Sequence, residues 1–217
     1  MNLMRLAYLP LLALLLTGCA EATRAGGDGW VMLFNGKDLA GWEQLNGTAK
    51  YEARDGMIVG TSVAGSPNSF LCTKQKYGDF ELEFEVKCDK ALNSGVQIRS
   101  ESRADYKDGR VHGYQVEIAV GGFSGGIYDE ARRAKFLNAE KPTDEIRALL
   151  KENVWNTYRV VCQGDRIQTW VNGRQVTDLR DDVTRTGFIG LQVHGVGDRA
   201  DPLRVQWRNI RLRELKS

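Results

Sequence analysis

The feature that most constrains this chain is a strict alternation of apolar and charged residues over 80–87, which reads FELEFEVK. Every even position in this segment is apolar and every odd position is charged. Successive side chains of a β-strand point to opposite faces of its sheet. The segment therefore predicts a strand with one face buried and the other in water, as in an antiparallel sheet.

Short segments with the same alternation recur from Trp30 onward, between turn signals. Hairpins are expected at 51–60 around Asp55-Gly56 and at 166–176 around Asn172-Gly173, because these dipeptides tolerate the positive φ angles of tight turns. Thr143 is expected to cap one short helix whose apolar stripe is Ile146, Leu149 and Leu150. Together these signals predict an all-β antiparallel sandwich or barrel. The other expected strands are 95–100, 113–120, 155–163, 188–194 and 203–212.

The N-terminus has the anatomy of an export signal. Arg5 precedes an apolar stretch over 6–16, which is shorter than the roughly 20 residues needed to span a bilayer as a helix. The stretch ends in LTGC (residues 16–19), which resembles a bacterial lipobox and predicts cleavage before Cys19 and acylation of that residue. The alternative is ordinary secretory cleavage.

The expected organisation is a signal peptide over 1–18, a small, polar, Gly-rich tether over 19–29 and a single domain over 30–217. A lipid anchor at Cys19 would place this domain in the cell envelope. Ala20, next to the anchor, fits sorting to the outer membrane, with the domain facing the periplasm.

Composition narrows the classes of partner. The chain has 30 Lys and Arg against 28 Asp and Glu, with no basic run interleaved with aromatic residues, and this excludes a nucleic-acid-binding surface. The domain retains Cys72, Cys88 and Cys162, whose spacing includes no CxxC and disfavours structural zinc. Either one disulfide or three small buried thiols fits the sequence.

Three strands share an unusual set of polar residues. Because side chains alternate, each strand is expected to place two polar residues on one face: Gln97 with Arg99, Gln115 with Glu117, and Gln192 with His194. Amides and a guanidinium bind sugar hydroxyls, and a carboxyl group and an imidazole can also transfer protons. We expect these residues to form one site if the three strands are neighbours in a sheet.

A second informative stretch, SGGIYDEARR, covers residues 124–133. Its paired glycines allow a bend or a close approach of the backbone. Tyr128 and Asp129 follow at an expected strand end, where binding loops gather. They are candidates to bind substrate, although a structural turn with an Asp cap would show the same sequence pattern.

The ordered set of such segments resembles the 3-keto-disaccharide hydrolase family over nearly the whole chain after the tether. The resemblance implies a two-sheet antiparallel jelly-roll sandwich of the concanavalin A-like or laminin G-like type, and activity on sugars oxidised at C3. The segments that carry it are LFNGKDLAGW (33–42), NSGVQIR (93–99), GYQVEI (113–118), GGIYDE (125–130), WN (155–156), TWVNG (169–173), GLQVHG (190–195) and RNI (208–210).

A ketone at C3 acidifies the proton on C2, so a base can remove that proton and expel the C1 oxygen before water adds back. Glu117 and His194 are the candidates for base and acid, in either order, and Arg99 suits the enolate oxygen. A divalent metal held by Glu117 and His194 could replace Arg99 in this role. The candidates to bind the sugar hydroxyls are Gln97, Gln115, Gln192 and Tyr128, together with Asp129.

One departure from the family pattern matters. Relatives commonly carry Asp two positions after the glutamate, where this chain has Ala119, so a second carboxylate is missing from the expected face. This favours the rival hypothesis, a non-catalytic carbohydrate-binding module on a lipid tether, which would use aromatic platforms such as Trp42, Trp170 or Tyr128. A structural or partner-binding lipoprotein is the third possibility.

Overall fold

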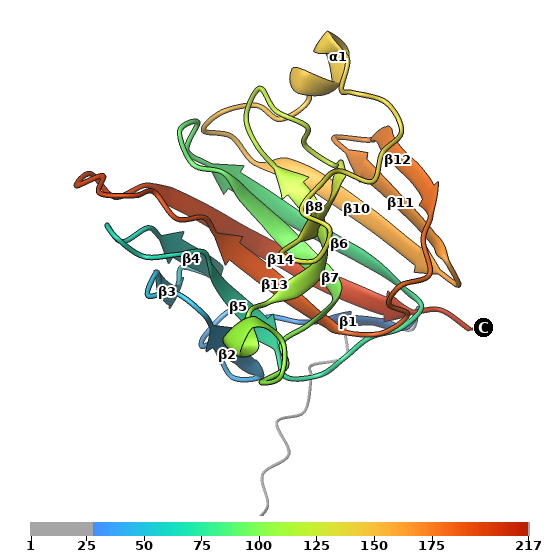
Figure 1. The fold of residues 1–217 in the computed structure, drawn as a ribbon, viewed down its shortest axis with the longest axis horizontal. Coiled ribbons are helices and arrows are strands. Elements are labelled where there is room, and N and C mark those ends of the chain that lie inside the picture. The colour runs from blue at the N-terminus through green and yellow to red at the C-terminus, as the bar shows by residue number, and fades with distance from the viewer. Residues whose placement is uncertain (1–27, 217) are drawn as a thin grey trace, which may run out of the picture.

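The computed structural model describes residues 28–216. The signal peptide, Cys19 and most of the tether lie outside the described residues. The described part forms two antiparallel sheets with one short α-helix (Figure 1). Among these residues, no helix is long and apolar enough to cross a membrane.

The larger sheet, here called the back sheet, has the strand order β12-β11-β10-β6-β14-β4-β3, with β1 paired to β14. Its central strand β6 is the alternating segment, and its apolar residues are buried as predicted. The strands are β1 (Trp30–Met32), β3 (Lys50–Arg54), β4 (Met57–Thr61), β6 (Phe80–Cys88), β10 (Asn156–Gln163), β11 (Arg166–Val171), β12 (Arg174–Arg180) and β14 (Arg204–Glu214).

The smaller sheet, here called the site sheet, has the order β2-β5-β13-β7-β8-β9. The three strands with polar pairs, β13, β7 and β8, are neighbours at its centre, which confirms the condition on which the predicted site depended. The strands are β2 (Trp42–Leu45), β5 (Ser69–Thr73), β7 (Ser94–Glu101), β8 (His112–Ile118), β9 (Ile127–Glu130) and β13 (Phe188–Val193).

The core lies between the two sheets. Leu82 and Trp207 of the back sheet and Val116 and Leu191 of the site sheet are almost completely buried in one apolar cluster. Burial of this apolar surface is the main force that holds the layers together. The predicted jelly-roll sandwich is therefore confirmed, including both hairpins.

The structure selects one of the two alternatives for the cysteines, and it confirms the start of the expected helix but not its apolar stripe, because Leu149 and Leu150 lie beyond the helix. Cys72, Cys88 and Cys162 are all buried free thiols. The helix α1 (Asp144–Arg147) begins after Thr143, whose hydroxyl accepts a hydrogen bond from the backbone N–H of Ile146, as predicted for an N-cap.

The turn before β9 explains one of the paired glycines. Gly125 has φ +84°, and a Cβ atom there would lie 2.8 Å from a methyl group of Val171. Its carbonyl accepts hydrogen bonds from the hydroxyls of Thr169 and Thr177, both in the back sheet. This close approach fixes where β9 begins at the edge of the site sheet.

Candidate active site

The outer face of the site sheet carries the polar residues that the sequence singled out. In the β-ladders Gln97 lies opposite Gln115, and Gly95 lies opposite both Glu117 and Gln192. Paired residues of an antiparallel ladder point to the same face. The core occupies the other face, so these side chains gather on the outside of the sandwich.

A cavity of about 320 Å³ opens over this face, a size within the usual range for ligand pockets. Four predicted residues line it, namely Gln115, Glu117, Tyr128 and His194. Four further lining residues were not singled out from the sequence: Asn68, Asn93, Glu130 and Phe136.

Two hydrogen bonds fix the position of the Glu117 carboxyl group in the cavity. Its Oε1 accepts a hydrogen bond of 2.5 Å from the Asn93 amide, and its Oε2 accepts one of 3.1 Å from the Gln115 amide. The pKa of Glu117 is raised above its ordinary value because burial disfavours the charged form, although Asn93, Gln115 and the charge of His194 act in the opposite direction. A carboxyl group of raised pKa can exchange protons closer to neutral pH.

A chain of buried hydrogen bonds runs from Ser100 through Gln97 and Gln115 to the carboxyl group of Glu117. The hydroxyl of Ser100 donates to Oε1 of Gln97, and Nε2 of Gln97 donates to Oε1 of Gln115 at 2.7 Å. This order leaves Nε2 of Gln115 as the group that faces Glu117. Gln97 is completely buried and therefore positions Gln115 without lining the cavity itself.

Gly95 makes this chain possible. A Cβ atom at residue 95 would lie 2.4 to 2.8 Å from three side-chain atoms of Gln115. The absence of a side chain there leaves Gln115 room to lie across the sheet between Gln97 and Glu117.

His194 follows the end of β13 and is exposed at the cavity. Its Nδ1 lies 2.8 Å from the carbonyl oxygen of Gly195, which can only accept a hydrogen bond, so Nδ1 carries a proton. In the neutral ring Nε2 then bears the free lone pair and can act as a base.

Glu130 brings a second carboxylate to the cavity, from β9 rather than from position 119, where this chain has alanine. Tyr128 and Glu130 are two residues apart on β9 and share the outer face. Glu130 accepts hydrogen bonds from Arg110 at 2.9 Å and from Asn68 at 3.4 Å. Burial and the nearby charges of Glu130 and Glu117 raise the pKa of Tyr128, so its hydroxyl stays protonated and can donate.

Arg99 does not reach the cavity, and the expectation that it shares a face with Gln97 is wrong. A β-bulge after Ile98 and a φ of +46° at Arg99 break the alternation. The completely buried guanidinium donates to the carbonyl oxygens of Gly78 and Gly164 and pairs with Asp79 at 2.8 Å. Its contacts are structural.

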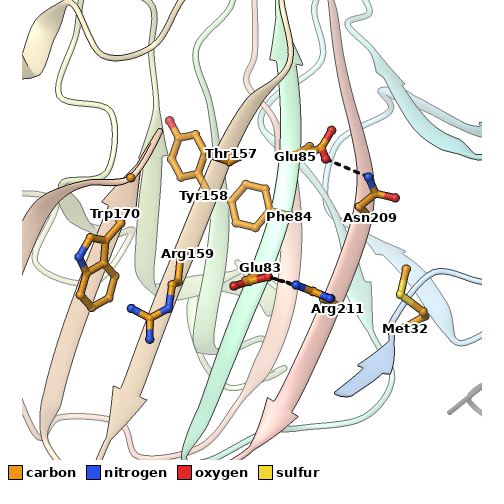
Figure 2. Close-up of a pocket in the computed structure, with 11 residues that line it drawn as sticks. Met32, Glu83, Phe84, Glu85, Thr157, Tyr158, Arg159, Trp170, Asn209 and Arg211 are labelled. Atoms are coloured by element: carbon orange, nitrogen blue, oxygen red, sulfur yellow. Dashed lines mark hydrogen bonds and ion pairs between the residues drawn. The ribbon is translucent and has the colours of Figure 1, made fainter. Parts of the chain in front are cut away.

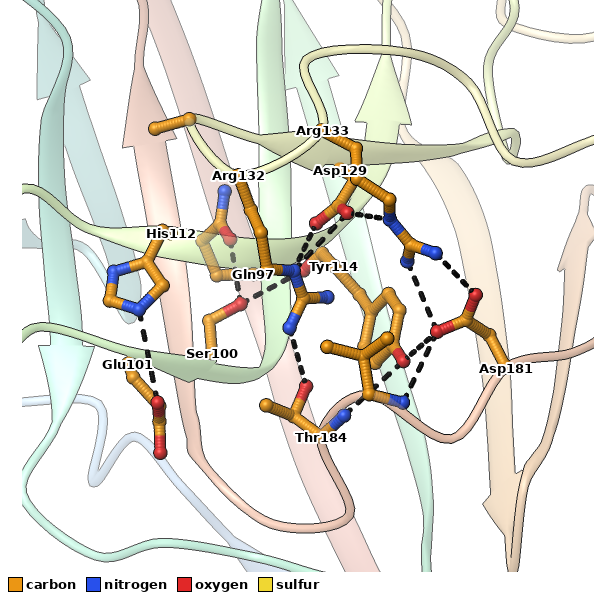
Figure 3. A network of polar contacts seen from close by, with 12 residues as sticks. Gln97, Ser100, Glu101, His112, Tyr114, Asp129, Arg132, Arg133, Asp181 and Thr184 are labelled. Carbon is orange, nitrogen blue, oxygen red and sulfur yellow. Dashed lines mark hydrogen bonds and ion pairs between the residues drawn. The ribbon is translucent and has the colours of Figure 1, made fainter.

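Asp129 is also misplaced by the sequence argument, because it points to the opposite face from Tyr128. It is completely buried, and it pairs with Arg132 at 2.8 Å and with Arg133 (Figure 3). Arg133 also pairs with Asp181, the residue that accepts the hydrogen bond of the Tyr114 hydroxyl. Through Arg133, Asp129 therefore links β9 to the segment after β12, and it does not line the cavity.

Gln192 lies on the predicted face but does not line the cavity. Its side chain is completely buried, and neither its oxygen nor its nitrogen has a hydrogen-bond partner among the described residues. The predicted set therefore divides: Gln115, Glu117, Tyr128 and His194 meet, Gln97 supports them, and the other three stand apart.

A second hollow of about 450 Å³ continues from this cavity, and the two share Asn93, Glu117 and Phe136. Its remaining lining comes from Ala119, Gly122 and Phe123, from Arg147 of α1, and from the segment before α1: Asn138, Ala139, Glu140, Lys141 and Pro142. Glu117 thus stands where the two hollows meet.

A larger hollow, about 740 Å³, lies elsewhere, over the outer face of the back sheet (Figure 2). Its arginines are already paired: Arg211 with Glu83, and Arg159 with Glu81 at 2.5 Å. Although burial raises the pKa of Glu85, hydrogen bonds from Asn209 and Arg208 lower it overall, opposite to Glu117. Proton-transfer chemistry therefore favours the site sheet.

No metal centre stands out in residues 28–216, where no group of three or more His, Cys, Asp or Glu side chains is arranged to hold an ion. The cavity instead offers one carboxyl group of raised pKa, one imidazole, one phenol and several amides. Such groups can bind hydroxyls and move protons to and from a small polar ligand.

Nearly all the described residues also match a known protein family. The family model described as the 3-keto-alpha-glucoside-1,2-lyase-like domain matches residues 29–213. A comparison with curated proteins found no match.

Solved structures share the fold. A candidate glycosyl hydrolase from Parabacteroides distasonis superposes with a TM-score of 0.62 at 19% identity, covering 87% of this chain and 94% of that one. The carbohydrate-binding module CBM66 from Bacillus subtilis gives 0.60 at 19% identity, covering 80% and 96%. The Bacillus licheniformis β-glucanase gives 0.56 at 15% identity, covering 89% and 100%. The fold is thus one used by carbohydrate-active hydrolases and by carbohydrate-binding modules.

Proposed function

Since the chain belongs to the 3-keto-alpha-glucoside-1,2-lyase-like family, we propose that it cleaves glycosides oxidised at C3 by removing the C2 proton, expelling the C1 oxygen and adding water. The observation that carries the proposal is the meeting of Glu117 and His194 at one cavity, where burial raises the pKa of the carboxyl group.

The first step is proton abstraction. The C3 ketone makes the C2 proton acidic, and the pair of electrons released from the C2–H bond forms an enolate whose charge rests on the C3 oxygen. His194 Nε2 is the free base in the neutral ring, and Glu117 is the alternative base when ionised. Hydrogen-bond donors must face the developing oxyanion.

Arg99 cannot supply that donor, because its guanidinium is buried against Gly78, Gly164 and Asp79. The other donors of the cavity are the hydroxyl of Tyr128 and the amides of Asn68, Asn93 and Gln115, and each of these amides already gives one hydrogen bond to a carboxylate. The raised pKa of Tyr128 keeps its O–H available for this role.

In the second step the enolate reforms the C3 ketone, a double bond forms between C1 and C2, and the C1–O bond breaks. The leaving oxygen takes a proton from the protonated partner, and a raised pKa suits Glu117 for this task at neutral pH. Water then adds its oxygen to C1 while a proton returns to C2, so the sum of the steps is hydrolysis.

The test is turnover of a disaccharide carrying a C3 ketone. Glu117→Gln keeps the shape of the side chain but removes its proton exchange, so we expect cleavage to fall by about 100-fold or more. Circular dichroism checks that the variant remains folded. Unchanged turnover in the folded variant would remove Glu117 from the mechanism.

A second function, carbohydrate binding without cleavage, draws on one observation. Phe136 is 37% exposed at the mouth of the cavity, and its ring packs edge-on against Tyr128, 5.3 Å away. The exposed part of this aromatic ring can pack against the apolar face of a sugar. Of the other candidate platforms, Trp42 is buried and Trp170 lies on the back sheet. Binding of a 3-keto-disaccharide without any product would favour this alternative.

We further propose that the domain acts in the cell envelope on a lipid anchor at Cys19, facing the periplasm from the outer membrane. The support is the LTGC sequence at residues 16–19 and the Gly-rich stretch that follows it. Metabolic labelling with a radioactive fatty acid should mark the parent chain and leave Cys19→Ala unlabelled. Equal labelling of both chains would contradict the anchor.

A further inference from the structure

The second hollow beside Glu117 has a different chemistry from the cavity of the predicted residues. We propose that it binds an aromatic aglycone, so that this protein accepts aryl 3-keto-glycosides in addition to 3-keto-disaccharides. This inference rests on the proposed function for the assignment of the sugar ring to the polar cavity.

The first argument is continuity. Both hollows are lined by Asn93, Glu117 and Phe136, so a ligand larger than the polar cavity can extend past Glu117 into the second hollow. A glycoside has a sugar ring on one side of its C1–O bond and the leaving group on the other. The second hollow is therefore the place for the leaving group.

The second argument is the pair of phenylalanine rings in this hollow. Phe123 and Phe136 pack with ring centres 5.0 Å apart and planes inclined by 41°. Only three large apolar side chains of the described residues are as exposed as Phe136, the other two being Val154 and Val183. Aromatic rings placed this way offer stacking or edge contacts to a planar apolar ligand.

The third argument is that the amides of the hollow are already engaged. Asn138 uses its oxygen for the backbone N–H of Ile127 and its amide for Thr177, and the Asn93 amide is bound to Glu117. Ala119 and Pro142 add apolar surface, whereas the charged lining residues Glu140, Lys141 and Arg147 are exposed to solvent. A planar apolar group can therefore cover the phenylalanine rings, Ala119 and Pro142 without displacing any of these hydrogen bonds.

Ala119 takes on a specific meaning in this arrangement. It stands two residues after Glu117 and lines the second hollow, with its Cβ atom near Gly122. Its methyl group brings no charge to the wall that an aromatic leaving group would touch.

The experiment uses two ligands, phenyl 3-keto-α-glucoside and a 3-keto-disaccharide, with binding measured by calorimetry on the full domain that carries Glu117→Gln. In that background, Phe123→Ala, at a residue that lines the second hollow but not the polar cavity, should weaken binding of the phenyl ligand by about tenfold and change disaccharide binding by less than about twofold. Phe136 lines both hollows, so Phe136→Ala should weaken binding of both ligands, and binding of the phenyl ligand more strongly. Val183→Ala, which shortens an apolar side chain that is 52% exposed away from the site, is the matched control and should change neither.

Turnover by the parent chain separates the two proposals. Cleavage of the disaccharide but no binding of the phenyl ligand would overturn the aglycone assignment and leave the proposed function intact. Binding of the phenyl ligand that depends on Phe136 and Phe123, without cleavage of either ligand, would support the subsite and overturn the proposed function. Equal losses of both ligands in the phenylalanine variants would overturn the preference for an aromatic aglycone.

Discussion

Replacing Arg99 with methionine separates a structural arginine from a catalytic one. The guanidinium is completely buried, donates to two backbone carbonyl groups and pairs with Asp79. Methionine keeps the apolar stem but removes all three interactions. A buried acceptor left without a donor costs about 1–3 kcal/mol, and breaking a buried ion pair costs about 3–5 kcal/mol. Asp79 is 22% exposed, so water can solvate it in part, and we expect the lower end, about 3 kcal/mol.

The assay is urea denaturation followed by circular dichroism. With a slope of roughly 3 kcal/mol per molar urea, Arg99→Met should lower the midpoint by about 1 M. The control is Arg159→Met, which breaks a pair whose arginine is 42% exposed and should cost at most about 1 kcal/mol. The folded fraction of Arg99→Met should retain turnover close to that of the parent. A variant as stable as the parent but inactive would refute the structural role and return Arg99 to the reaction.

Three further perturbations follow from the same contacts. The folded-state pKa of Glu117 is raised, so its contribution to stability is present below pH 4.5 and is lost as the pH rises through the folded pKa. Glu117→Gln should therefore remove part of the decline in the urea midpoint over that range, and parallel pH profiles would contradict this. Gly95→Ala should lower turnover by about tenfold or more by displacing Gln115, and the overpacking should cost about 1–3 kcal/mol of stability; a fully active variant would contradict the role of that amide. Burial raises the pKa of Cys88 and of Cys162 to about 12, so native thiols should react slowly with maleimide and a reductant should leave the melting temperature unchanged; a drop with reductant would reveal a disulfide.

The sequence predicted the architecture well wherever the alternation of side chains ran without interruption. The strand β6 and both hairpins were readable because the two-residue period and the Asp-Gly and Asn-Gly turns each have a direct backbone cause. The strands β1, β2 and β5 were missed, since β1 and β2 are three and four residues long and β5 is buried on both faces. Strands that are short, or that do not alternate apolar with polar residues, as in the SFLCT of β5, lack the periodic signal.

The site was predicted in part for the same reason. Glu117, Gln115 and His194 follow the alternation and meet as expected. Arg99 does not, because a β-bulge reverses its side chain, and nothing in the residues 96–101 announces that bulge. A one-residue irregularity is enough to move a side chain to the other face.

Other residues were within reach of the argument. Asn93 stands two positions before Gly95, so continuing the period past β7 would have found it, whereas Asn68 precedes β5, which has no such period. The same period pairs Tyr128 with Glu130 rather than with Asp129. Phe136 lies in an irregular segment, where only the folded chain determines its position.

The measurement that tests the central claim most directly is cleavage of a 3-keto-disaccharide in heavy water, with the product followed by NMR. If the C2 proton is removed during the reaction, the released 3-keto sugar should carry one deuterium at C2 in the first turnovers, faster than a sample without protein acquires it. The unoxidised parent disaccharide should remain intact. Cleavage that leaves hydrogen at C2, or equal cleavage of the unoxidised disaccharide, would contradict the mechanism built on Glu117 and His194.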